Sequence, residues 1–343
     1  MPENPRNATP LNWPAVVQEA LRRRKAEKLT QREHAALASV SIPTMAAFER
    51  GETTLTLSKA FDIIRVLGLL DEASAQGPQE AFVRDAFDRW RSLTTRLPKG
   101  SASRFPHGFY RFDYCLEGDV KSPGLKGLAD ILGKAVISHA GWPLFRIPRQ
   151  SEAPTREVDG ALECWLGSDE AASANRIFRD AAHSDFWRAT PEGRLFVIRG
   201  YQEDAQETFA PGTIMDTTLP IWRMGEALLH AEKVAALMRN SDSAPITIRF
   251  RALYSGLSGR LLRSWASPLA GNLIDGHAAG GDEAMLETVI PAENVSGRLS
   301  EHLFPLIASL YERFGVAGLS ENRVKAEVDR FLDSRSPLNN ISP

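Results

Sequence analysis

Glu203 and Asp204 are adjacent carboxylates in the 343-residue chain. Carboxylates can take part in acid–base chemistry or bind a metal ion. These two residues follow Arg199 and Tyr201 at the end of a stretch that alternates like a strand. Neighbouring side chains in a strand point to opposite faces, so these carboxylates can share a proton or a metal ion only where the backbone has already turned. We therefore expect Glu203 and Asp204 to lie on a solvent-exposed turn.

A polar stripe follows in a predicted helix at 221–239. Its members share one face of that helix, and they are Arg223, Glu226, His230 and Lys233. Ion pairing on the helix surface is the simplest account of this stripe. The alternative is a pocket in which His230 acts as an acid or base, which together with the two carboxylates would form the centre of a nuclease or hydrolase.

Aromatic residues interleaved with arginines form a third chemical pattern. Tryptophan and tyrosine rings stack on planar groups, and arginine makes paired hydrogen bonds with carboxylates and phosphates. The pattern favours a large aromatic core with arginines at its rim, and a site for an anionic or planar ligand is the alternative. The candidate ligand-binding residues are Trp142, Arg199, Tyr201, Trp222, Arg223 and His230.

Neither a metal site nor a cofactor site is predicted. Cys115 and Cys164 are far apart in the sequence, which excludes a disulfide framework and a four-cysteine zinc site. His139 and His183 have no partners at a spacing typical of metal ligands. The chain also lacks the common phosphate-binding, dinucleotide-binding, zinc-protease and nucleophile-elbow motifs. We predict no catalytic residue and no cofactor.

The charge is unevenly distributed along the chain. The formal net charge is -2, and the 43% hydrophobic and 24% charged residues are typical of an ordinary globular protein. Residues 11–70 nevertheless carry a balance of +3, and residues 71–343 carry -5. The basic residues of the first block cluster at Arg22, Arg23, Arg24, Lys25 and Lys28. A basic block of this kind is compatible with a nucleic-acid partner.

Residues 11–70 are predicted to form four short helices. Thr30 and Glu33 match a capping box, and Ser41 is a helix N-cap. Gly51 and Gly68 are placed to end helices. The predicted helices span 14–27, 31–38, 42–50 and 59–67. Residues 39–41 leave only a tight turn between the second and third helices, which is typical of a helix-turn-helix unit.

Residues 29–41 read Leu-Thr-Gln-Arg-Glu-His-Ala-Ala-Leu-Ala-Ser-Val-Ser. Further along follow Thr44-Met45, Phe48-Glu49-Arg50-Gly51, Ala60-Phe61 and Leu67-Gly68. Together these residues resemble the Cro/C1-type (XRE) helix-turn-helix family over about residues 14–70. The resemblance implies an all-α unit that binds double-stranded DNA, with the helix at 42–50 in the major groove.

The resemblance also implies a role for individual residues. Gln31 and Thr44 match positions that grip DNA phosphates, and Met45 and Phe48 match buried positions. Glu49 matches a glutamate that pairs with a basic residue of the first helix, here Arg22 or Arg23. The residues expected to contact DNA are Gln31, Arg32, Ser41, Ile42, Pro43, Thr44, Ala46, Ala47, Arg50, Arg23 and Arg24.

Three departures from the family pattern affect these expectations. His34 stands where a core leucine is usual, and Ser39 stands where the turn glycine is usual. We expect the second helix to bury Ala35, Leu37 and Ala38. The base-facing positions are apolar and cannot form the bidentate hydrogen bonds worth ~1–3 kcal/mol of base discrimination each. The sequence therefore predicts contacts to thymine methyl groups, supported by Arg50, by the backbone or by DNA shape.

Beyond residue 70 the pattern changes. A helix at 79–95 has an apolar stripe that belongs to a core or to a dimer contact, and 97–107 has the composition of a domain boundary. Strands and helices then alternate irregularly, which indicates an α+β domain. The strands are expected at 109–114, 144–147, 161–166, 195–201, 246–253 and 285–290, and the helices at 125–138, 221–239, 298–314 and 324–332.

Four phrases in this region are similar to the C-terminal part of bacterial Schlafen/Alba-type DNA-binding proteins. They are Gly-Trp-Pro-Leu-Phe at 141–145, Asp-Phe-Trp-Arg at 185–188, Arg-Gly-Tyr-Gln-Glu-Asp at 199–204 and Pro-Ile-Trp-Arg at 220–223. The Alba-type motif itself is absent from the sequence. The similarity implies a module that is joined to different DNA-binding front ends, and thus a sensor or dimerisation domain.

These observations predict an all-α helix-turn-helix domain at 11–70, a helical linker at 71–107 and an α+β domain at 108–333, with tails at 1–10 and 334–343. The predicted protein is a cytoplasmic, nucleoid-associated DNA-binding regulator, expected to act as a repressor. It would bind a pseudo-palindromic operator as a homodimer, and a small molecule or protein would act as effector. No membrane partner is expected, because no apolar run reaches ~18–20 residues. The alternatives are an enzyme with an appended DNA-binding domain and an antitoxin-like scaffold.

Overall fold

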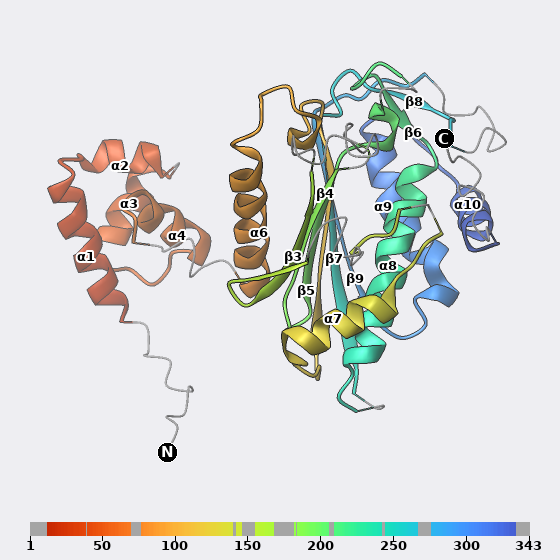
Figure 1. Ribbon diagram of the computed structural model, residues 1–343. Coiled ribbons are helices and arrows are strands. Elements are labelled where there is room, and N and C mark those ends of the chain that lie inside the picture. Colours follow the sequence, from red (N-terminus) through yellow and green to blue (C-terminus); the bar gives the residue numbers. More distant parts are fainter. Residues whose placement is uncertain are drawn as a thin grey trace. The chain divides into compact units, whose positions relative to one another are not determined.

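The computed structural model describes residues 12–38, 40–69, 77–139, 142–145, 155–167, 182, 184–205, 209–241, 244–266 and 276–333. The chain divides into two compact units, Met1–Ala81 and Phe82–Pro343 (Figure 1). The predicted tails at 1–10 and 334–343, the first residues of the predicted linker and Ser39 lie outside the described residues.

The N-terminal unit contains a four-helix arrangement built from short, well-capped helices. They are α1 (Trp13–Ala26), α2 (Gln31–Leu37), α3 (Ile42–Glu49) and α4 (Leu57–Val66). Asn12, Ser41 and Thr56 each accept a hydrogen bond from a backbone N–H in the first turn of α1, α3 and α4, which satisfies a donor that the helix leaves unpaired. Gly51 and Gly68 both adopt positive φ where α3 and α4 end.

The core of this unit corrects one prediction for the second helix. Ala35 and Ala38 are buried as expected, but Leu37 is 61% exposed and His34 is buried instead. The His34 Nε2 lies 2.9 Å from the carbonyl oxygen of Ile63. A buried carbonyl near the end of α4 therefore has a partner that leucine could not provide, which explains a polar residue at this core position.

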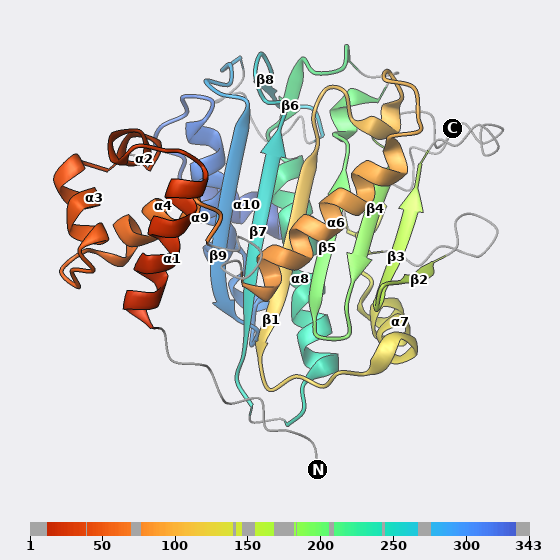
Figure 2. The same ribbon diagram turned by 90° about the vertical axis from the view of Figure 1, so that its left-hand side faces the viewer.

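The large unit is built on a seven-stranded antiparallel sheet (Figure 2). Its order is β2-β3-β4-β5-β1-β7-β9, and every neighbouring pair is antiparallel. The strands are β1 (Tyr110–Gly118), β2 (Arg156–Val158), β3 (Ala161–Leu166), β4 (Asp185–Ala189), β5 (Arg194–Arg199), β7 (Ile246–Ser255) and β9 (Glu283–Pro291). An α+β fold is confirmed.

One face of the sheet is covered by four helices (Figure 1). They are α7 (Gly124–Ala135), α8 (Leu219–Met238), α9 (Leu299–Glu312) and α10 (Glu321–Asp333). Helix α8 is buried along most of its length, and it packs with Phe112, Tyr114 and Phe250 in the main core. Long apolar strands facing this mostly buried helix form the largest hydrophobic cluster among the described residues.

Helix α6 (Pro78–Thr94) covers part of the opposite face. Its residues Phe82, Ala86 and Trp90 are buried in one cluster with Phe186 and Phe196 of the sheet. The apolar stripe predicted at 79–95 is thus core, and the helix predicted within a linker packs on the large unit.

The structure also contains elements that the sequence did not predict. A two-stranded parallel sheet pairs β6 (Ile214–Asp216) with β8 (Leu261–Arg263), and β4 was missed. The strand predicted at 144–147 is wrong in its first half, because Leu144 and Phe145 form a buried turn; residues 146 and 147 lie outside the described residues. No helix in the described ranges is long and apolar enough to cross a membrane.

Two loops of the large unit cross at a pair of glycines. Gly108 precedes β1 and Gly256 follows β7, and both have positive φ. A Cβ atom on Gly108 would lie 2.3 Å from the Ser255 carbonyl oxygen, and one on Gly256 would lie 2.5 Å from that of His107. Neither position can carry a side chain without moving the backbone of the other loop.

Candidate DNA-binding face and ligand pocket

The recognition helix α3 separates its buried and outward residues cleanly. Met45 and Phe48 are buried, as the family resemblance implied. Ser41, Ile42, Pro43 and Arg50 are exposed, and Thr44, Ala46 and Ala47 are half-buried. Ser41 Oγ accepts the N–H of Thr44 at 3.2 Å and lies 2.8 Å from the Thr44 hydroxyl. The cap therefore positions Thr44 as well as the start of the helix.

The ion pair of Glu49 corrects the predicted partner. The structure pairs Glu49 with Arg24, at 3.0 Å between Oε1 and Nε, and not with Arg22 or Arg23. The other carboxylate oxygen of Glu49 accepts a hydrogen bond from Gln31 Nε2 at 2.8 Å. Glu49 thus connects α1, α2 and α3, and it fixes the side chain predicted to grip a phosphate.

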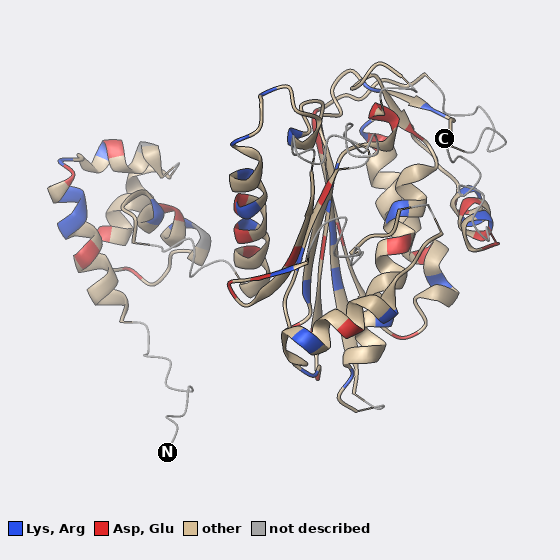
Figure 3. Ribbon diagram, in the orientation of Figure 1, with Lys and Arg blue, Asp and Glu red and all other residues tan. Residues whose placement is uncertain are grey.

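The other basic residues that were expected to contact DNA differ in their partners within the structure. Arg23 donates to the carbonyl oxygens of Leu67 and Gly68, at 3.2 and 2.9 Å, so it closes the end of α4. Arg50 pairs with Glu52 at 2.7 Å, and Arg32 is exposed on α2. The basic residues in the last turn of α1 lie close to the start of α2 (Figure 3), so a phosphate there would meet their positive charge.

The capping box predicted at the start of α2 is present. Glu33 Oε2 accepts hydrogen bonds from both the backbone N–H and the hydroxyl of Thr30, each at 2.8 Å. The Thr30 hydroxyl in turn accepts the N–H of Glu33. These bonds, the backbone one first, lower the pKa of Glu33 below its usual value. The negative charge stays at the helix N-terminus, where it is favourable.

In the large unit, hydrogen bonds bring together three candidate ligand-binding residues, Trp142, Arg199 and Arg223, beside the sheet. Tyr110 on β1 faces Arg199 on β5 and Tyr254 on β7. Arg199 and Arg223 both donate to the Trp142 carbonyl oxygen at 3.1 Å. The two guanidinium groups therefore converge, but each already has a carboxylate partner in the interior.

These carboxylates leave the arginines largely neutralised. Arg199 lies 2.5 Å from Asp185, and both side chains are about 3% exposed. Arg223 lies 3.0 Å from Glu226, which is fully buried. Helix-surface ion pairing, expected for the polar stripe of this helix, is therefore wrong: α8 lies inside the unit, and only Lys233 of that stripe is exposed.

Two candidate residues lie away from this group. The Nδ1 of His230 is 2.9 Å from the Tyr114 hydroxyl, and its ring stacks on Phe145 at 4.8 Å between centroids. Burial lowers the pKa of His230 to about 3, and Lys233 adds to the shift. Trp222 is 7% exposed, and its Nε1 has no hydrogen-bond partner in the described part of the chain. His230 is a neutral core residue.

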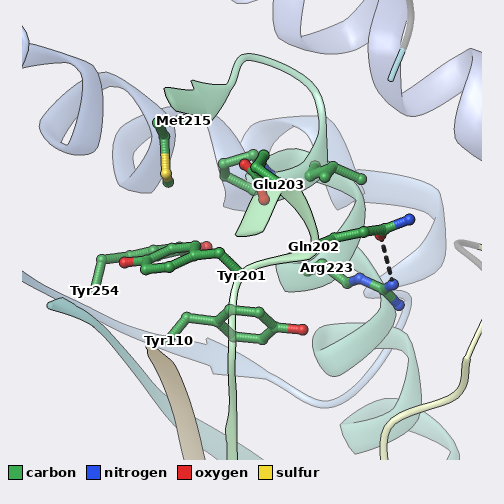
Figure 4. A pocket seen from close by; sticks show the side chains of 9 residues that line it. Tyr110, Tyr201, Gln202, Glu203, Met215, Arg223 and Tyr254 are labelled. Carbon is green, nitrogen blue, oxygen red and sulfur yellow. Dashed lines mark hydrogen bonds between the residues drawn. The ribbon is translucent and has the colours of Figure 1, made fainter. Parts of the chain in front are cut away.

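A pocket opens where the ends of β1 and β7 meet the start of α8 (Figure 4). Its cavity has a volume of about 20 Å³, which is room for a single water molecule. The lining residues are Tyr110, Tyr201, Gln202, Glu203, Met215, Leu219, Pro220, Arg223 and Tyr254. Of the predicted ligand-binding residues only Tyr201 and Arg223 line it. Tyr110 and Tyr254 were missed, although each lies at the inward position of an alternating strand.

The three pocket tyrosines lie within 6.1–6.4 Å of one another, centroid to centroid. The Tyr201 hydroxyl donates to the Ser255 carbonyl oxygen at 2.8 Å. The Tyr254 hydroxyl is buried and has no partner among the described residues. An unpaired hydroxyl in a pocket wall leaves a hydrogen bond for a water molecule or a ligand to make.

Glu203 and Asp204 are buried, and the predicted solvent-exposed turn is wrong. They lie on a 3-10 turn, η5 (Gln202–Asp204). Asp204 pairs with the fully buried Arg260 at 2.6 Å, whereas Glu203 accepts the N–H of Asp216 at 2.7 Å. Burial raises the pKa of Glu203 to about 7, and the charge of Asp216 adds to this. The two carboxylates point to different partners.

Asp216 lies at the centre of this group of buried polar residues. Its carboxylate accepts four backbone N–H groups at 2.7–2.8 Å, from Thr218, Leu219, Trp265 and Ala266. Two of these donors begin α8 and the other two follow β8. Burial nevertheless raises the pKa of Asp216 above its usual value.

The structure does not bring Glu203, Asp204 and His230 together as a nuclease or hydrolase centre would need. His230 is held by Tyr114, and Asp204 by Arg260. Within the described residues, no three histidine, cysteine or carboxylate side chains gather as a metal site. Both cysteines are buried, and burial raises the pKa of the Cys115 thiol to about 11 and that of Cys164 further.

Comparison with known proteins agrees with the N-terminal unit. Residues 21–72 match the family model described as helix-turn-helix. This segment is a Cro/C1-type (XRE-family) helix-turn-helix, the class that binds DNA in transcription regulators. No curated protein and no solved structure matches the chain. The likeness of the C-terminal region to Schlafen/Alba-type proteins stays a prediction.

Proposed function

We propose that the protein is a transcription repressor that binds a pseudo-palindromic operator as a homodimer. The observation that carries this proposal is the exposed face of α3. The N-cap and the buried residues of α3 match those of a recognition helix, and the residues at its N-terminal end, Ser41, Ile42 and Pro43, are exposed to solvent. One such unit covers few base edges, so a symmetric pair on half-sites about one DNA turn apart is the natural arrangement. A bound dimer would act by occupying the operator, in the cytoplasm and on the nucleoid.

DNA would be held mainly by polar groups around the start of α2. Gln31, Thr44 and the basic end of α1 contact phosphates in this proposal, and Gln31 exchanges Glu49 for a phosphate oxygen. Ile42, Pro43, Ala46 and Ala47 read the major groove by contacting thymine methyl groups. Much of the affinity is then electrostatic, and it falls steeply with salt.

Fluorescence anisotropy with the region upstream of the protein's own coding sequence tests this proposal at ~150 mM salt. Gln31→Ala and Thr44→Ala should weaken binding to all sequences. Gln18→Ala and Thr53→Ala are matched controls, because both residues are exposed elsewhere on the unit. Equal affinity for the upstream region and for random DNA would contradict the proposal.

For the large unit we propose a sensor role based on the tyrosine-lined pocket. Its Tyr254 hydroxyl, which has no partner among the described residues, can donate a hydrogen bond to a small planar anion, whereas Arg223 is already neutralised by Glu226. Benzoate is a suitable first probe, and it should raise the melting temperature of the wild-type protein more than that of Tyr254→Phe. If benzoate shifts the melting temperatures of both proteins equally, or shifts neither, this pocket has no sensor role. Glu203 and Asp204 have structural partners, so the proposal gives them no catalytic part.

A further inference from the structure

The edge strand β9 has one side of its backbone free. The N–H of Ala292 donates to the carbonyl oxygen of Ile246, and in an antiparallel pair the hydrogen-bonded positions alternate. With the register of β7 and β9, the even-numbered residues of β9 therefore bond to β7. The odd-numbered residues Met285, Glu287 and Val289 turn their N–H and carbonyl groups outward, and none of these groups has a partner among the described residues.

The side chains along this edge offer little protection against another strand. Met285 is 51% exposed and Val289 is 48% exposed. Lysine, an internal proline or a bulge commonly guard such edges, yet β9 pairs with β7 over all nine residues, and its proline, Pro291, stands at the end. The opposite edge of the sheet, β2, is only three residues long.

The pattern on β9 is symmetric about Glu287. Met285 lies two residues before it and Val289 two residues after it, all on the same face. When two such strands pair antiparallel about a twofold axis at Glu287, each Met285 meets the Val289 of the other copy. The outward backbone groups of one strand then meet those of the other, as an isologous interface requires.

The charge on this face is compatible with that register. The two Glu287 side chains meet at the axis, where like charges are unfavourable. Each carboxylate, however, has a cation beside it: Arg249 Nη1 lies 3.2 Å from Glu287 Oε1, and the same guanidinium also pairs with Glu117 at 2.9 Å. Shifting the register by two residues, so that Met285 pairs with Glu287 of the other copy, would place both Met285 side chains opposite glutamates and lose the apolar contacts.

We propose that β9 pairs with β9 of a second copy, joining the two sheets into one continuous antiparallel sheet centred on Glu287. The inference rests on the homodimer of the proposed function, and it locates the interface. Main-chain hydrogen bonds supply the association, and the Met285–Val289 contacts set the register.

Disulfide trapping in the full-length chain without DNA tests this pairing. Residues opposite each other in a hydrogen-bonded antiparallel pair have Cα atoms about 5.5 Å apart, a distance that a disulfide can span. With oxidised glutathione, Glu287→Cys should form a covalent dimer on a non-reducing gel. The wild-type protein should not, because Cys115 and Cys164 are buried.

Matched variants check the register. Met285→Cys and Val289→Cys should each stay uncrosslinked alone and crosslink when mixed. Val289→Lys should raise the Kd of the dimer about tenfold or more in sedimentation analysis, whereas Leu237→Lys, an exposed site on α8, should leave it unchanged. Glu287→Gln should lower the Kd, since it removes the like-charge pair.

The outcomes separate this inference from the function on which it rests. A dimeric protein in which Glu287→Cys does not crosslink has its interface elsewhere, which overturns the strand pairing and leaves the homodimer standing. A protein that is monomeric in sedimentation and still binds its operator as a monomer overturns both.

Discussion

The two units differ in how deeply they bury their ion pairs. In the helix-turn-helix, Arg22 and Glu19 pair at the surface, where the arginine side chain is 68% exposed. In the large unit, Arg260 and Asp204 pair at 2.6 Å with exposures of 0% and 2%. Among the described residues, Arg24–Glu49 is the most buried ion pair of the first unit, at 15% and 17% exposure, whereas the second unit holds ion pairs that are almost completely buried.

This difference determines which charged groups of each unit can change partners when a ligand or DNA binds. A surface ion pair contributes little to stability, so an arginine of α1 can leave its glutamate for a phosphate at small cost. A buried pair has lost the hydration of both ions, and it is strongly destabilising to break although it is a weak source of stability when intact. Ligand binding in the large unit would therefore act through polar groups that lack a partner among the described residues, such as the Tyr254 hydroxyl.

The largest expected effect comes from breaking a buried pair. Arg260→Ala leaves Asp204 buried without its partner and should lower the free energy of unfolding of the large unit by roughly 3–5 kcal/mol. Urea unfolding measures this. Arg22→Ala is the control from the other unit and should leave the midpoint unchanged; a similar loss in both variants would remove the contrast between the units.

The second effect is a dependence on pH. The pKa of Glu203 is about 7 in the folded protein against 4.5 ordinarily, so between these values the folded chain holds a proton that the unfolded chain has lost. Stability should therefore fall as pH rises from 5 to 7, by on the order of 1 kcal/mol per pH unit from this group. His230 contributes the opposite slope below pH 6.5, because its pKa is lowered to about 3.

Glu203→Gln isolates the pH dependence of stability that Glu203 contributes. Relative to the wild type, this variant should gain stability between pH 5 and pH 7 in urea unfolding. Glu19→Gln is the control from the surface of the other unit: hydrogen bonds from Arg22 and Arg23 lower the pKa of Glu19 to about 2, against a smaller opposing effect of burial, so its titration lies below this window. An unchanged difference between wild type and Glu203→Gln across the window would count against a buried, protonated Glu203.

A smaller effect is expected at the cap of the recognition helix. Ser41→Ala removes the acceptor for the Thr44 N–H and should cost about 1 kcal/mol of stability, confined to the N-terminal unit. Operator affinity should fall with it, because Thr44 loses its positioning contact. Hydrogen exchange of the α3 amides reports the local loss; a change in the large unit instead would show that the two units are coupled.

The smallest effect concerns base preference. Ile42→Ala shortens an exposed apolar side chain and should change the preferred base pair at one operator position by about 1 kcal/mol or less, with little change in salt dependence. Selection from a randomised operator library checks it. Loss of affinity for all sequences alike would assign Ile42 to folding or to phosphate positioning.

Local signals predicted the N-terminal unit well because its elements are set by neighbours in sequence. The Thr30–Glu33 box, the Ser41 cap and Gly51 act within four residues. The Arg24–Glu49 pair was missed by one or two positions, since choosing among consecutive arginines depends on how α1 is rotated against α3.

The interior of the large unit could not be predicted in the same way. Glu203 and Asp204 look like a surface turn until Arg260, 56 residues later, is placed beside Asp204. The pocket likewise depends on the register of β5, β1 and β7, which aligns Arg199, Tyr110 and Tyr254 across three strands. No pattern within one segment records such pairings.

The glycine crossing of the large unit has a consequence for finding its relatives. Because each loop occupies the space that a side chain on the other would need, Gly108 and Gly256 can only change together, along with a displacement of both loops. A chain that shares this sheet should carry glycine at both places whatever DNA-binding unit precedes it. The pair offers a signature by which the large domain can be traced independently of the helix-turn-helix.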